Sequence, residues 1–140
     1  MGFTNHLENN VLDHVFGGGD YSRPATLEIG LSTTPIDDDG TGITEPDGAD
    51  GYARVTVDND TDTWEDAETA PAGEHAGKGC KTNKIVINFP EAAGDWDEVT
   101  HMFISDGTNV LAYGTLDTPR TVENGQVASF AAGAFIITLD

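Results

Sequence analysis

The sequence predicts a mainly β fold: an antiparallel β-sandwich or small barrel with one short N-terminal amphipathic helix. Short segments with an apolar residue at every second position recur from residue 26 onward, as expected of strands that bury one face. Turn signals such as Asp-Gly and Asn-Gly separate these segments, and the chain has 17 glycines. Only the start of the chain has apolar residues at helical spacing.

The predicted helix lies within residues 1–19. Its apolar residues recur at spacings of three to five, which places them on one face: Leu7, Val11, Leu12, Val15 and Phe16. Thr4 and Asn5 precede this pattern, and Glu8 lies where it could close a capping box onto Asn5. Gly17 and its two following glycines then end the helix, because glycine tolerates the left-handed backbone of a helix C-terminus.

We divide the chain into a helical arm, residues 1–19, and a β-sandwich domain, residues 20–140. Alternation predicts six to eight short strands in that domain, within residues 26–32, 52–57, 83–89, 99–104, 110–114, 119–122, 127–130 and 134–139. In the second strand we expect Ala53, Val55 and Val57 to face inward, and in the third Ile85, Ile87 and Phe89. The fourth strand is apolar on both faces, so we expect both to be covered.

Two long polar segments separate these strands. Residues 35–50 are rich in Asp, Gly, Thr and Pro, with Ile43 as the single candidate for burial. Residues 58–78 are polar as well, and Trp64 is their only large apolar anchor. Such compositions predict exposed loops.

The charge excludes several classes of partner. Six Lys and Arg stand against 25 Asp and Glu, which gives a net charge of −19. This field repels phosphate backbones and anionic membranes, so we expect no nucleic-acid and no membrane binding. Two interpretations remain open: a solvated acidic surface, or carboxylates that hold divalent cations or meet a basic partner.

Neither cysteine chemistry nor targeting segments are evident. Cys80 is the only cysteine, which excludes an intrachain disulfide and a cysteine-cluster metal site. The N-terminus lacks a basic region followed by an apolar run, so no secretory signal is predicted. No apolar stretch approaches eighteen residues, so no membrane span is predicted either.

One loop offers a weak candidate for a cation site. Its aspartates alternate: Asp58, Asp60 and Asp62. The helix–loop–helix calcium motif also needs Gly at its sixth position and Glu at its twelfth, where this chain has Thr63 and Thr69. A looser oxygen cage with Glu65 stays open beside the alternative of an acidic turn in solvent. We expect no other cofactor.

No catalytic constellation can be read from the sequence. His75 and Cys80 lie close together, but two such ligands fall short of the four of a structural zinc site. A nucleophilic Cys–His pair would also need an orienting group and an oxyanion pocket, and neither is evident. We therefore predict that the protein is not an enzyme. A cation-dependent hydrolase is the weakest alternative.

The apolar helix face has two interpretations. Its side chains could pack on the β-domain of their own chain. Alternatively, the helix lies against a neighbouring subunit, since a terminal element with a wide apolar face is suited to exchange between protomers.

Six segments resemble, in order, parts of a family of small tailed-bacteriophage virion proteins often labelled phage tail fibre protein. They are residues 2–18 (GFTNHLENNVLDHVFGG), 21–35 (YSRPATLEIGLSTTP), 51–55 (GYARV), 87–90 (INFP), 94–101 (GDWDEVTH) and 130–140 (FAAGAFIITLD). The resemblance implies a structural protein of the virion, made in the host cytoplasm, with no catalytic residues to carry over.

Two functions follow from this resemblance. The chain is short for a fibre, lacks repeats and has no receptor-binding extension, which favours a capsid decoration or cement protein that stabilises the outer shell. Its partner would be the major capsid protein or another virion protein, and we expect a homotrimer. The alternative is a tail fibre or tail-associated protein that binds a receptor or glycan. Four aromatic residues could then supply exposed stacking faces, although such side chains more often belong to the core: Tyr52, Trp64, Trp96 and Tyr113.

Overall fold

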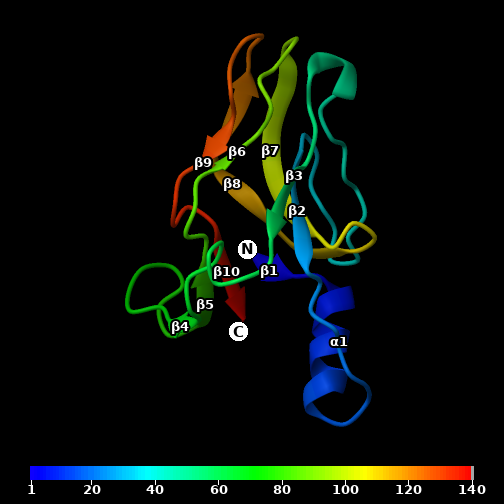
Figure 1. Cartoon of the computed structure of the whole chain (residues 1–140), viewed down its shortest axis with the longest axis vertical. Helices are drawn as coiled ribbons and strands as arrows, with labels where there is room; N and C mark the ends of the chain where they lie inside the picture. Colours follow the sequence, from blue (N-terminus) through cyan, green and yellow to red (C-terminus); the bar gives the residue numbers. More distant parts are fainter. Residues whose placement is uncertain (140) are drawn as a thin grey trace.

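A computed structural model describes residues 1–139, and it confirms a mainly β protein with one N-terminal helix (Figure 1). A single 3-10 turn, Gly48–Asp50, lies in the loop after the second strand. The other elements are β1 (Gly2–Phe3), α1 (Asn5–Val15), β2 (Thr26–Ser32), β3 (Val55–Asp58), β4 (Glu68–Thr69), β5 (Gly79–Thr82), β6 (Ile87–Asn88), β7 (Trp96–Ser105), β8 (Val110–Val122), β9 (Ser129–Phe130) and β10 (Ile136–Leu139).

The strands form three antiparallel sheets. The main sheet has the order β1-β8-β7-β2-β3, a second sheet has the order β10-β5-β4, and β6 pairs with β9. None of these sheets closes on itself in the part of the chain that is described, so the small-barrel alternative is wrong. The long β7–β8 hairpin supplies the centre of the main sheet. Its turn is built by Asp106, whose Oδ1 accepts hydrogen bonds from the backbone N–H groups of Thr108 and Asn109.

The core lies between the main sheet and the chain segments of the two smaller sheets. Aromatic rings form a continuous row through it. Tyr52 packs edge-on against Trp96 at 5.4 Å and stacks with Phe89 at 6.1 Å. Phe130 then lies 6.2 Å from Phe89 and 4.4 Å from Phe135. Such offset and edge-on pairs add to the stabilisation that comes from burying the ring area.

Both faces of β7 are covered near its C-terminal end, as the sequence predicts: residues 102–105 are all buried. The loop after β2 provides part of this cover, because Arg54 reaches across β2 and lies 4.9 Å from the centroid of the Phe103 ring. Its guanidinium bonds to both oxygens of Glu45, at 2.9 and 2.8 Å, and to Glu28 at 3.0 Å. Ile36 is buried in the same loop, whereas Ile43, the predicted candidate, is only partly buried.

Four predicted strands are shorter than expected, and those predicted at 127–130 and 134–139 each lose their first two residues, since β9 begins at Ser129 and β10 at Ile136. The strand predicted to begin at residue 52 begins at Val55, with Tyr52 buried and Ala53 exposed. The strand predicted over residues 83–89 is interrupted, and Ile85 is 40% exposed. The cause is Asn83, whose buried amide bonds to the backbone of residues 85, 131 and 135 and so replaces the regular ladder.

Other strands were joined or missed. The segments predicted at 110–114 and 119–122 belong to the single strand β8. Pairing of β10 with β5 confirms that the segment near residue 139 is tied into a sheet. The predicted strands do not include β1 and β4, which have only two residues each, or β5, whose sequence GCKT has no clear alternation. Because β1 pairs with β8, the first residues of the predicted arm belong to the main sheet. The boundary between residues 19 and 20 stays a prediction.

The ends of α1 confirm one expectation and correct another. The N-cap is Thr4, whose Oγ1 accepts a hydrogen bond from the N–H of Leu7 at 3.5 Å. Asn5 is the first helical residue, so Glu8 lies one position too late for the predicted capping box. At the other end Gly17 has a φ of +87°, and the N–H of Gly18 bonds to the carbonyl of residue 13, as in a glycine-terminated helix.

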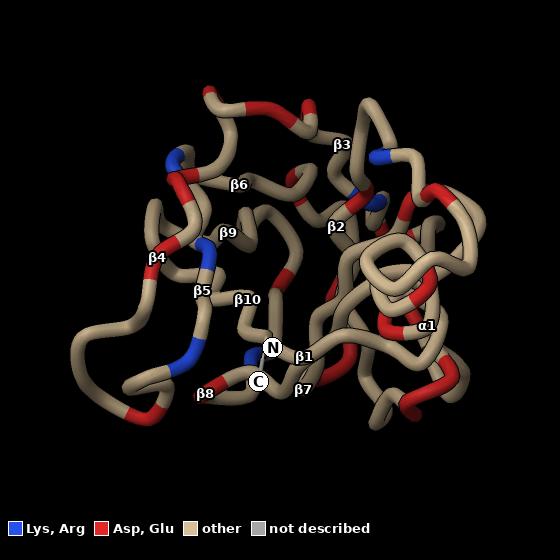
Figure 2. The backbone as a smooth tube through the Cα atoms, turned by 90° about the horizontal axis from the view of Figure 1, so that it is seen from below, with Lys and Arg blue, Asp and Glu red and all other residues tan. Residues whose placement is uncertain are grey.

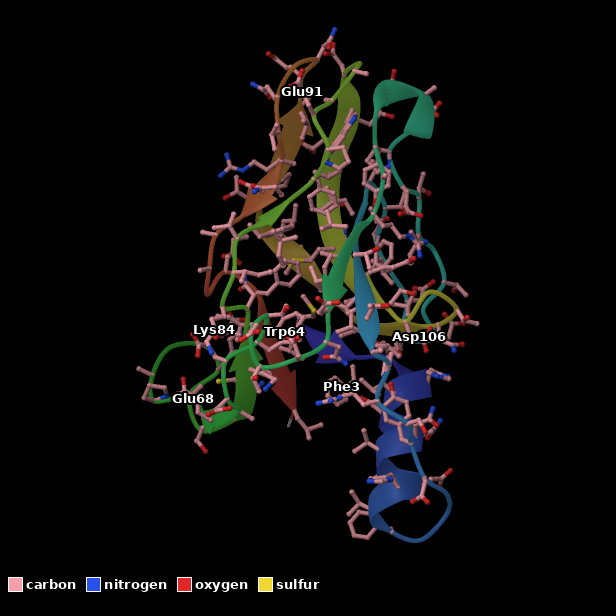
Figure 3. The ribbon with its side chains drawn as sticks, in the orientation of Figure 1. Phe3, Trp64, Glu68, Lys84, Glu91 and Asp106 are labelled. Atoms are coloured by element: carbon pink, nitrogen blue, oxygen red, sulfur yellow. The ribbon has the colours of Figure 1, made fainter. Side chains whose placement is uncertain are left out.

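No helix within residues 1–139 is long and apolar enough to cross a membrane. Acidic residues are distributed over strands and loops on several sides of the molecule (Figure 2). The long axis has two distinct ends, with α1 projecting at one end and the loop of Glu91 forming the other (Figure 3).

Candidate functional site

The base of α1 is fixed to the main sheet. Thr4 is fully buried, and its Oγ1 donates a 2.6 Å hydrogen bond to the carbonyl of Val110. The backbone N–H of Thr4 donates a hydrogen bond to the carbonyl of Leu111 at 2.9 Å, and the backbone N–H of Asn5 donates one to the carbonyl of Asp38 at 2.8 Å. These contacts fix the orientation of the base of α1 on the main sheet, and the rest of the helix projects from the β-domain.

The far end of α1 leaves its apolar side chains in solvent. Leu7 is partly buried and packs against the core, and Val11 is also partly buried. Three side chains further along are exposed: Leu12 by 54%, Val15 by 60% and Phe16 by 81%. The five predicted interface residues therefore divide into a base that contacts the chain's own body and a tip with little cover. No partner chain is present, so their role in an interface stays a prediction.

The segment that follows α1 returns along the helix. The backbone N–H of Tyr21 bonds to Nδ1 of His14 at 3.2 Å, and the Asp20 carboxylate lies 3.7 Å from that nitrogen. The pKa of Tyr21 is raised by partial burial and by the negative charge of Asp106 in the β7–β8 turn. The return segment thus supports the polar flank of the projection and leaves its tip open.

The three candidate cation ligands lie in an exposed turn: Asp58, Asp60 and Asp62. Oδ1 of Asp60 accepts hydrogen bonds from the N–H groups of Asp62 and Thr63, which is the geometry of a local turn. Among residues 1–139, no three His, Cys, Asp or Glu side chains lie in an arrangement that could hold a metal ion. The cation site stays a prediction without a geometric basis.

The predicted aromatic stacking faces are mostly wrong. Tyr52, Trp64 and Trp96 are each less than 10% exposed and belong to the core. Tyr113 is partly exposed, but its hydroxyl donates a hydrogen bond to the carboxylate of Asp38. A saccharide-binding role cannot therefore rest on these four side chains.

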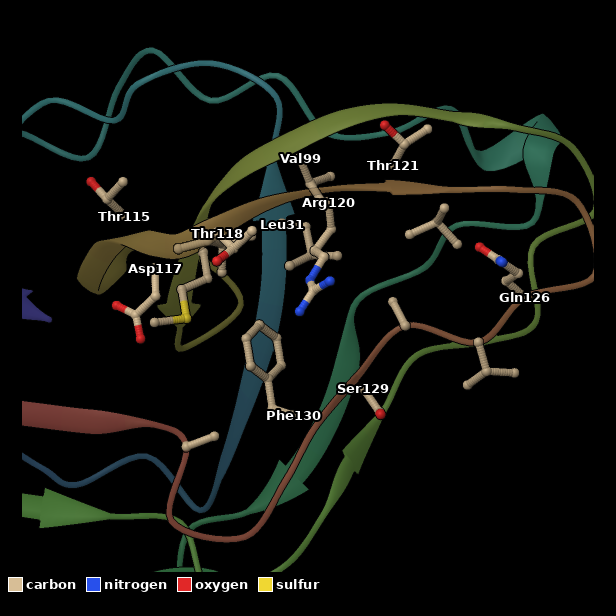
Figure 4. Close-up of a pocket in the computed structure, with 16 residues that line it drawn as sticks. Leu31, Val99, Thr115, Asp117, Thr118, Arg120, Thr121, Gln126, Ser129 and Phe130 are labelled. Atoms are coloured by element: carbon tan, nitrogen blue, oxygen red, sulfur yellow. The ribbon is translucent and has the colours of Figure 1, made fainter.

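A groove that the sequence did not predict lies beside the second half of β8. It has a volume of about 940 Å³ and runs between β8 and residues 126–130 (Figure 4). Apolar side chains from the core form its base, among them Val99, Met102 and Phe130. Polar side chains line its walls: Thr115, Asp117, Thr118, Arg120, Thr121, Gln126 and Ser129. The second half of β8 and residues 126–130, which line it, lie on the half of the molecule away from α1 (Figure 1).

An irregularity in β8 forms one wall of this groove. His101 of β7 pairs with Thr115, but Val99 pairs with Arg120, so the four residues 116–119 lie opposite Thr100 alone. Such a bulge bends the strand and redirects the side chains that follow it. Pro119 lies within it, where its missing N–H takes no hydrogen bond from the ladder. A proline within a predicted strand was the one sequence signal that could have indicated this feature.

Arg120 is the distinctive charge of the groove. Its side chain extends into the groove toward Phe130 (Figure 4). Within the described residues it forms no ion pair and no hydrogen bond, unlike Arg54, which bonds to two glutamates. The groove therefore offers an uncompensated guanidinium, several hydroxyls and an amide.

Comparison with models of known protein families gives a match over nearly the whole chain. Residues 2–138 match a family model described as podophage GP4 fiber I protein gp80. The chain matches no curated protein.

Proposed function

The chain belongs to the podophage GP4 fiber I protein gp80 family, and we propose that it is a fibre subunit that attaches to its neighbours through the apolar face of α1. Membership makes it a structural protein of the bacteriophage virion. A fibre protein fits the tail-fibre alternative better than the capsid-cement interpretation that chain length had favoured.

The observation that carries this proposal is the exposure of Leu12, Val15 and Phe16 on a helix whose base is fixed. Burying such a side chain contributes about 1.5–3 kcal/mol. Because these three are 54–81% exposed, together they can still bury about as much as two fully exposed side chains, or roughly 3–6 kcal/mol before the cost of association, whereas a micromolar complex needs about 8 kcal/mol net. The tip of α1 thus supplies much of an interface, but not all of it.

The remaining contacts can come from a second copy of the chain. β1 and β10 lie next to each other and offer a partly exposed apolar surface, with Phe3 partly buried and Leu139 52% exposed. Phe3 lies beside the base of α1 (Figure 3). A subunit that donates α1 to one neighbour and receives α1 from another forms a ring when the rotation between copies closes, and such a ring needs at least three copies. This supports the expected homotrimer.

Charge sets the conditions under which the trimer forms. Three subunits of −19 carry 3 × −19 = −57, so repulsion opposes assembly at low ionic strength. Salt at about 0.15 M limits this repulsion to roughly 8 Å and leaves apolar contacts intact. We expect association to strengthen as salt is added, the opposite of an interface held by ion pairs.

Light scattering after size-exclusion chromatography tests the proposal. At physiological salt the wild type should have three times the 14.8 kDa mass of the chain. Phe16→Asp should be monomeric, because it places a charge in the apolar interface. Asn9→Asp is the matched control, since it adds the same charge at an exposed position outside the set of five apolar residues and should remain trimeric.

Two results would refute this mode of assembly: a monomeric wild type at high salt, or a trimer that persists in Phe16→Asp. Point substitutions are preferable to deletion of residues 1–19. Deletion would also remove β1 and the buried Thr4, and so damage the main sheet itself. Circular dichroism of each variant verifies that the β-body is intact.

A second role is favoured by one specific observation, the groove beside β8. The segments that line it lie on the half of the molecule away from α1, so a subunit attached through α1 would leave the groove accessible. A fibre subunit with this arrangement could hold the virion at one end and contact a receptor at the other.

A further inference from the structure

We propose that the groove beside β8 binds an acidic saccharide, a sugar that bears a carboxylate, and that Arg120 binds this carboxylate. The inference rests on the proposed fibre function, since it names the class of receptor that such a subunit would contact. It depends on none of the residues of α1.

Arg120 is suited to this task by its isolation. The chain has 25 acidic residues against six basic ones, yet this guanidinium has no acidic partner within the described residues. A guanidinium offers five N–H donors in a planar fork that matches both oxygens of a carboxylate. Because Arg120 forms no bond within the protein, a ligand carboxylate would displace only water.

The rest of the lining favours a sugar over a simple anion. Thr118, Gln126 and Ser129 offer hydroxyl and amide groups that both donate and accept hydrogen bonds, as ring hydroxyls require. Asp117 adds a carboxylate that can accept only, which suits the O–H groups of a sugar. An inorganic anion would use none of these acceptors.

Phe130 provides an apolar surface for the face of a sugar ring. It is partly exposed, and its ring is held in place by Phe89 at 6.2 Å and Phe135 at 4.4 Å. A ring fixed in this way loses little conformational freedom when a ligand binds. Arg120 and Phe130 approach the groove from different strands, so a ligand that contacts both must span it (Figure 4).

Size and backbone geometry agree with this assignment. A volume of about 940 Å³ lies near the upper end of the roughly 300–1,000 Å³ of typical ligand clefts, so a short oligosaccharide can be held. The bulge at residues 116–119 immediately precedes Arg120 and sets its direction. Bulges of this kind are enriched next to binding sites, where they re-aim a side chain.

An acidic peptide is the main competing ligand, and Asp117 disfavours it. Asp117 lies in the same groove, and the side-chain carboxylates of an acidic peptide cannot donate a hydrogen bond to it, whereas the hydroxyls of a sugar can. A sugar with one carboxylate per ring places its charge at Arg120 and its hydroxyls at Asp117. At about 0.15 M salt the charges of the more distant acidic residues are screened, so the contacts with Arg120 and Asp117 determine which ligand binds.

The test is an amide NMR titration of the ¹⁵N-labelled full chain at physiological salt. The probes are trigalacturonate and galactotriose, a neutral trisaccharide that lacks the carboxylates. We expect saturable shifts at residues 115–130 with trigalacturonate and about tenfold weaker binding of galactotriose, since a charged hydrogen bond contributes about 1.5–3 kcal/mol. Arg120→Gln should lose that preference, and Arg120→Lys should restore part of it.

Arg23→Gln is the matched control, because Arg23 is an exposed arginine outside the groove, and its affinity should equal that of the wild type. Equal binding of the two trisaccharides, or unchanged binding in Arg120→Gln, would overturn the proposal. So would the absence of shifts with trigalacturonate, glucuronate and N-acetylneuraminate alike. Tighter binding of a hexaglutamate peptide would reassign the groove to a protein partner.

The two proposals fail in different ways. Phe16→Asp should bind trigalacturonate with wild-type affinity even though it is monomeric. Loss of sugar binding with an intact, α1-dependent trimer would remove the groove assignment and leave the fibre function in place. Conversely, a protein that binds trigalacturonate but stays monomeric would refute assembly through α1 and leave the groove assignment in place.

Discussion

Gly30 on β2 lies directly opposite Phe103 on β7, and the phenyl ring fills the space that a side chain at residue 30 would need. A Cβ built on Gly30 would lie 2.2 Å from Cζ of that ring, far inside any real contact. The guanidinium of Arg54 lies over the same ring. Gly30, Phe103 and Arg54 together cover a face of the main sheet that the alternating pattern of β2 alone would predict to be exposed.

Gly30→Ala should therefore destabilise the protein by about 1–3 kcal/mol, the usual cost of overpacking a rigid site. Urea denaturation followed by tryptophan fluorescence measures the change. Gly19→Ala is the control, because nothing lies within 4 Å of a Cβ at that position. Gly30→Ala combined with Phe103→Leu should recover part of the loss, and a neutral Gly30→Ala would contradict the proposed contact.

Arg54→Met should lower the free energy of unfolding at pH 7 by about 2 kcal/mol, since it leaves Glu45 without its charge-assisted hydrogen bonds. Burial raises the pKa of Glu45, but hydrogen bonds from Arg54 and Tyr52 outweigh it and hold the pKa below 4.5. This contribution is present above pH 4.5 and is lost as the pH falls through the lowered pKa of the folded state.

The difference in the free energy of unfolding between wild type and Arg54→Met should accordingly shrink as the pH falls below 4.5. Urea midpoints measured from pH 3 to pH 7 test this. Arg23→Met, which removes an exposed arginine, should match the wild type across the range. A gap that stays constant with pH would show that Arg54 acts by packing on Phe103 rather than through Glu45.

Tyr113 should titrate near pH 12. Its hydrogen bond to Asp38 raises its pKa from 10.0 to about 12, and partial burial and the charges of Asp38, Asp37 and Glu8 add to the shift. Because the pKa is raised in the folded state, the stabilisation is complete below pH 10 and is lost as the pH rises toward 12.

Ultraviolet absorbance of the ionised phenol follows this titration. Asp38→Asn should move one of the three tyrosine transitions back toward pH 10, whereas Asp39→Asn should leave all three unchanged. A spectrum that does not respond to Asp38→Asn would show that the hydrogen bond is absent in solution.

Removing divalent cations should leave the melting temperature unchanged. The turn at Asp58 is already satisfied by backbone hydrogen bonds to Asp60, and no three ligating side chains converge within residues 1–139. Differential scanning fluorimetry with calcium and with EDTA measures this. A calcium-dependent rise that disappears in Asp62→Asn would establish the cation site and refute the expectation.

Local pattern predicted the elements whose stability comes from neighbours along the chain. The strand at residues 26–32 and the helix that ends at Gly17 have the predicted character, because alternation and a glycine stop act over a few residues. It failed where a distant contact replaces the local preference. Asn83 interrupts a strand by binding the backbone near residue 131, 48 positions away.

Composition and local patterns were thus enough to predict the β class, the single helix with its apolar face, the excess of acidic residues and the resemblance to virion proteins. Tertiary structure decided which apolar side chains are buried: Leu7 packs on the core, whereas Phe16 is in solvent on the same helix. It also decided that Arg120 and Phe130 share a groove. The physical reason is that periodicity shows only on which side of its own helix or strand a residue lies. Whether that side is covered, and which residues of other elements lie close to it, depends on how β8 bends and pairs with strands that are distant in the sequence.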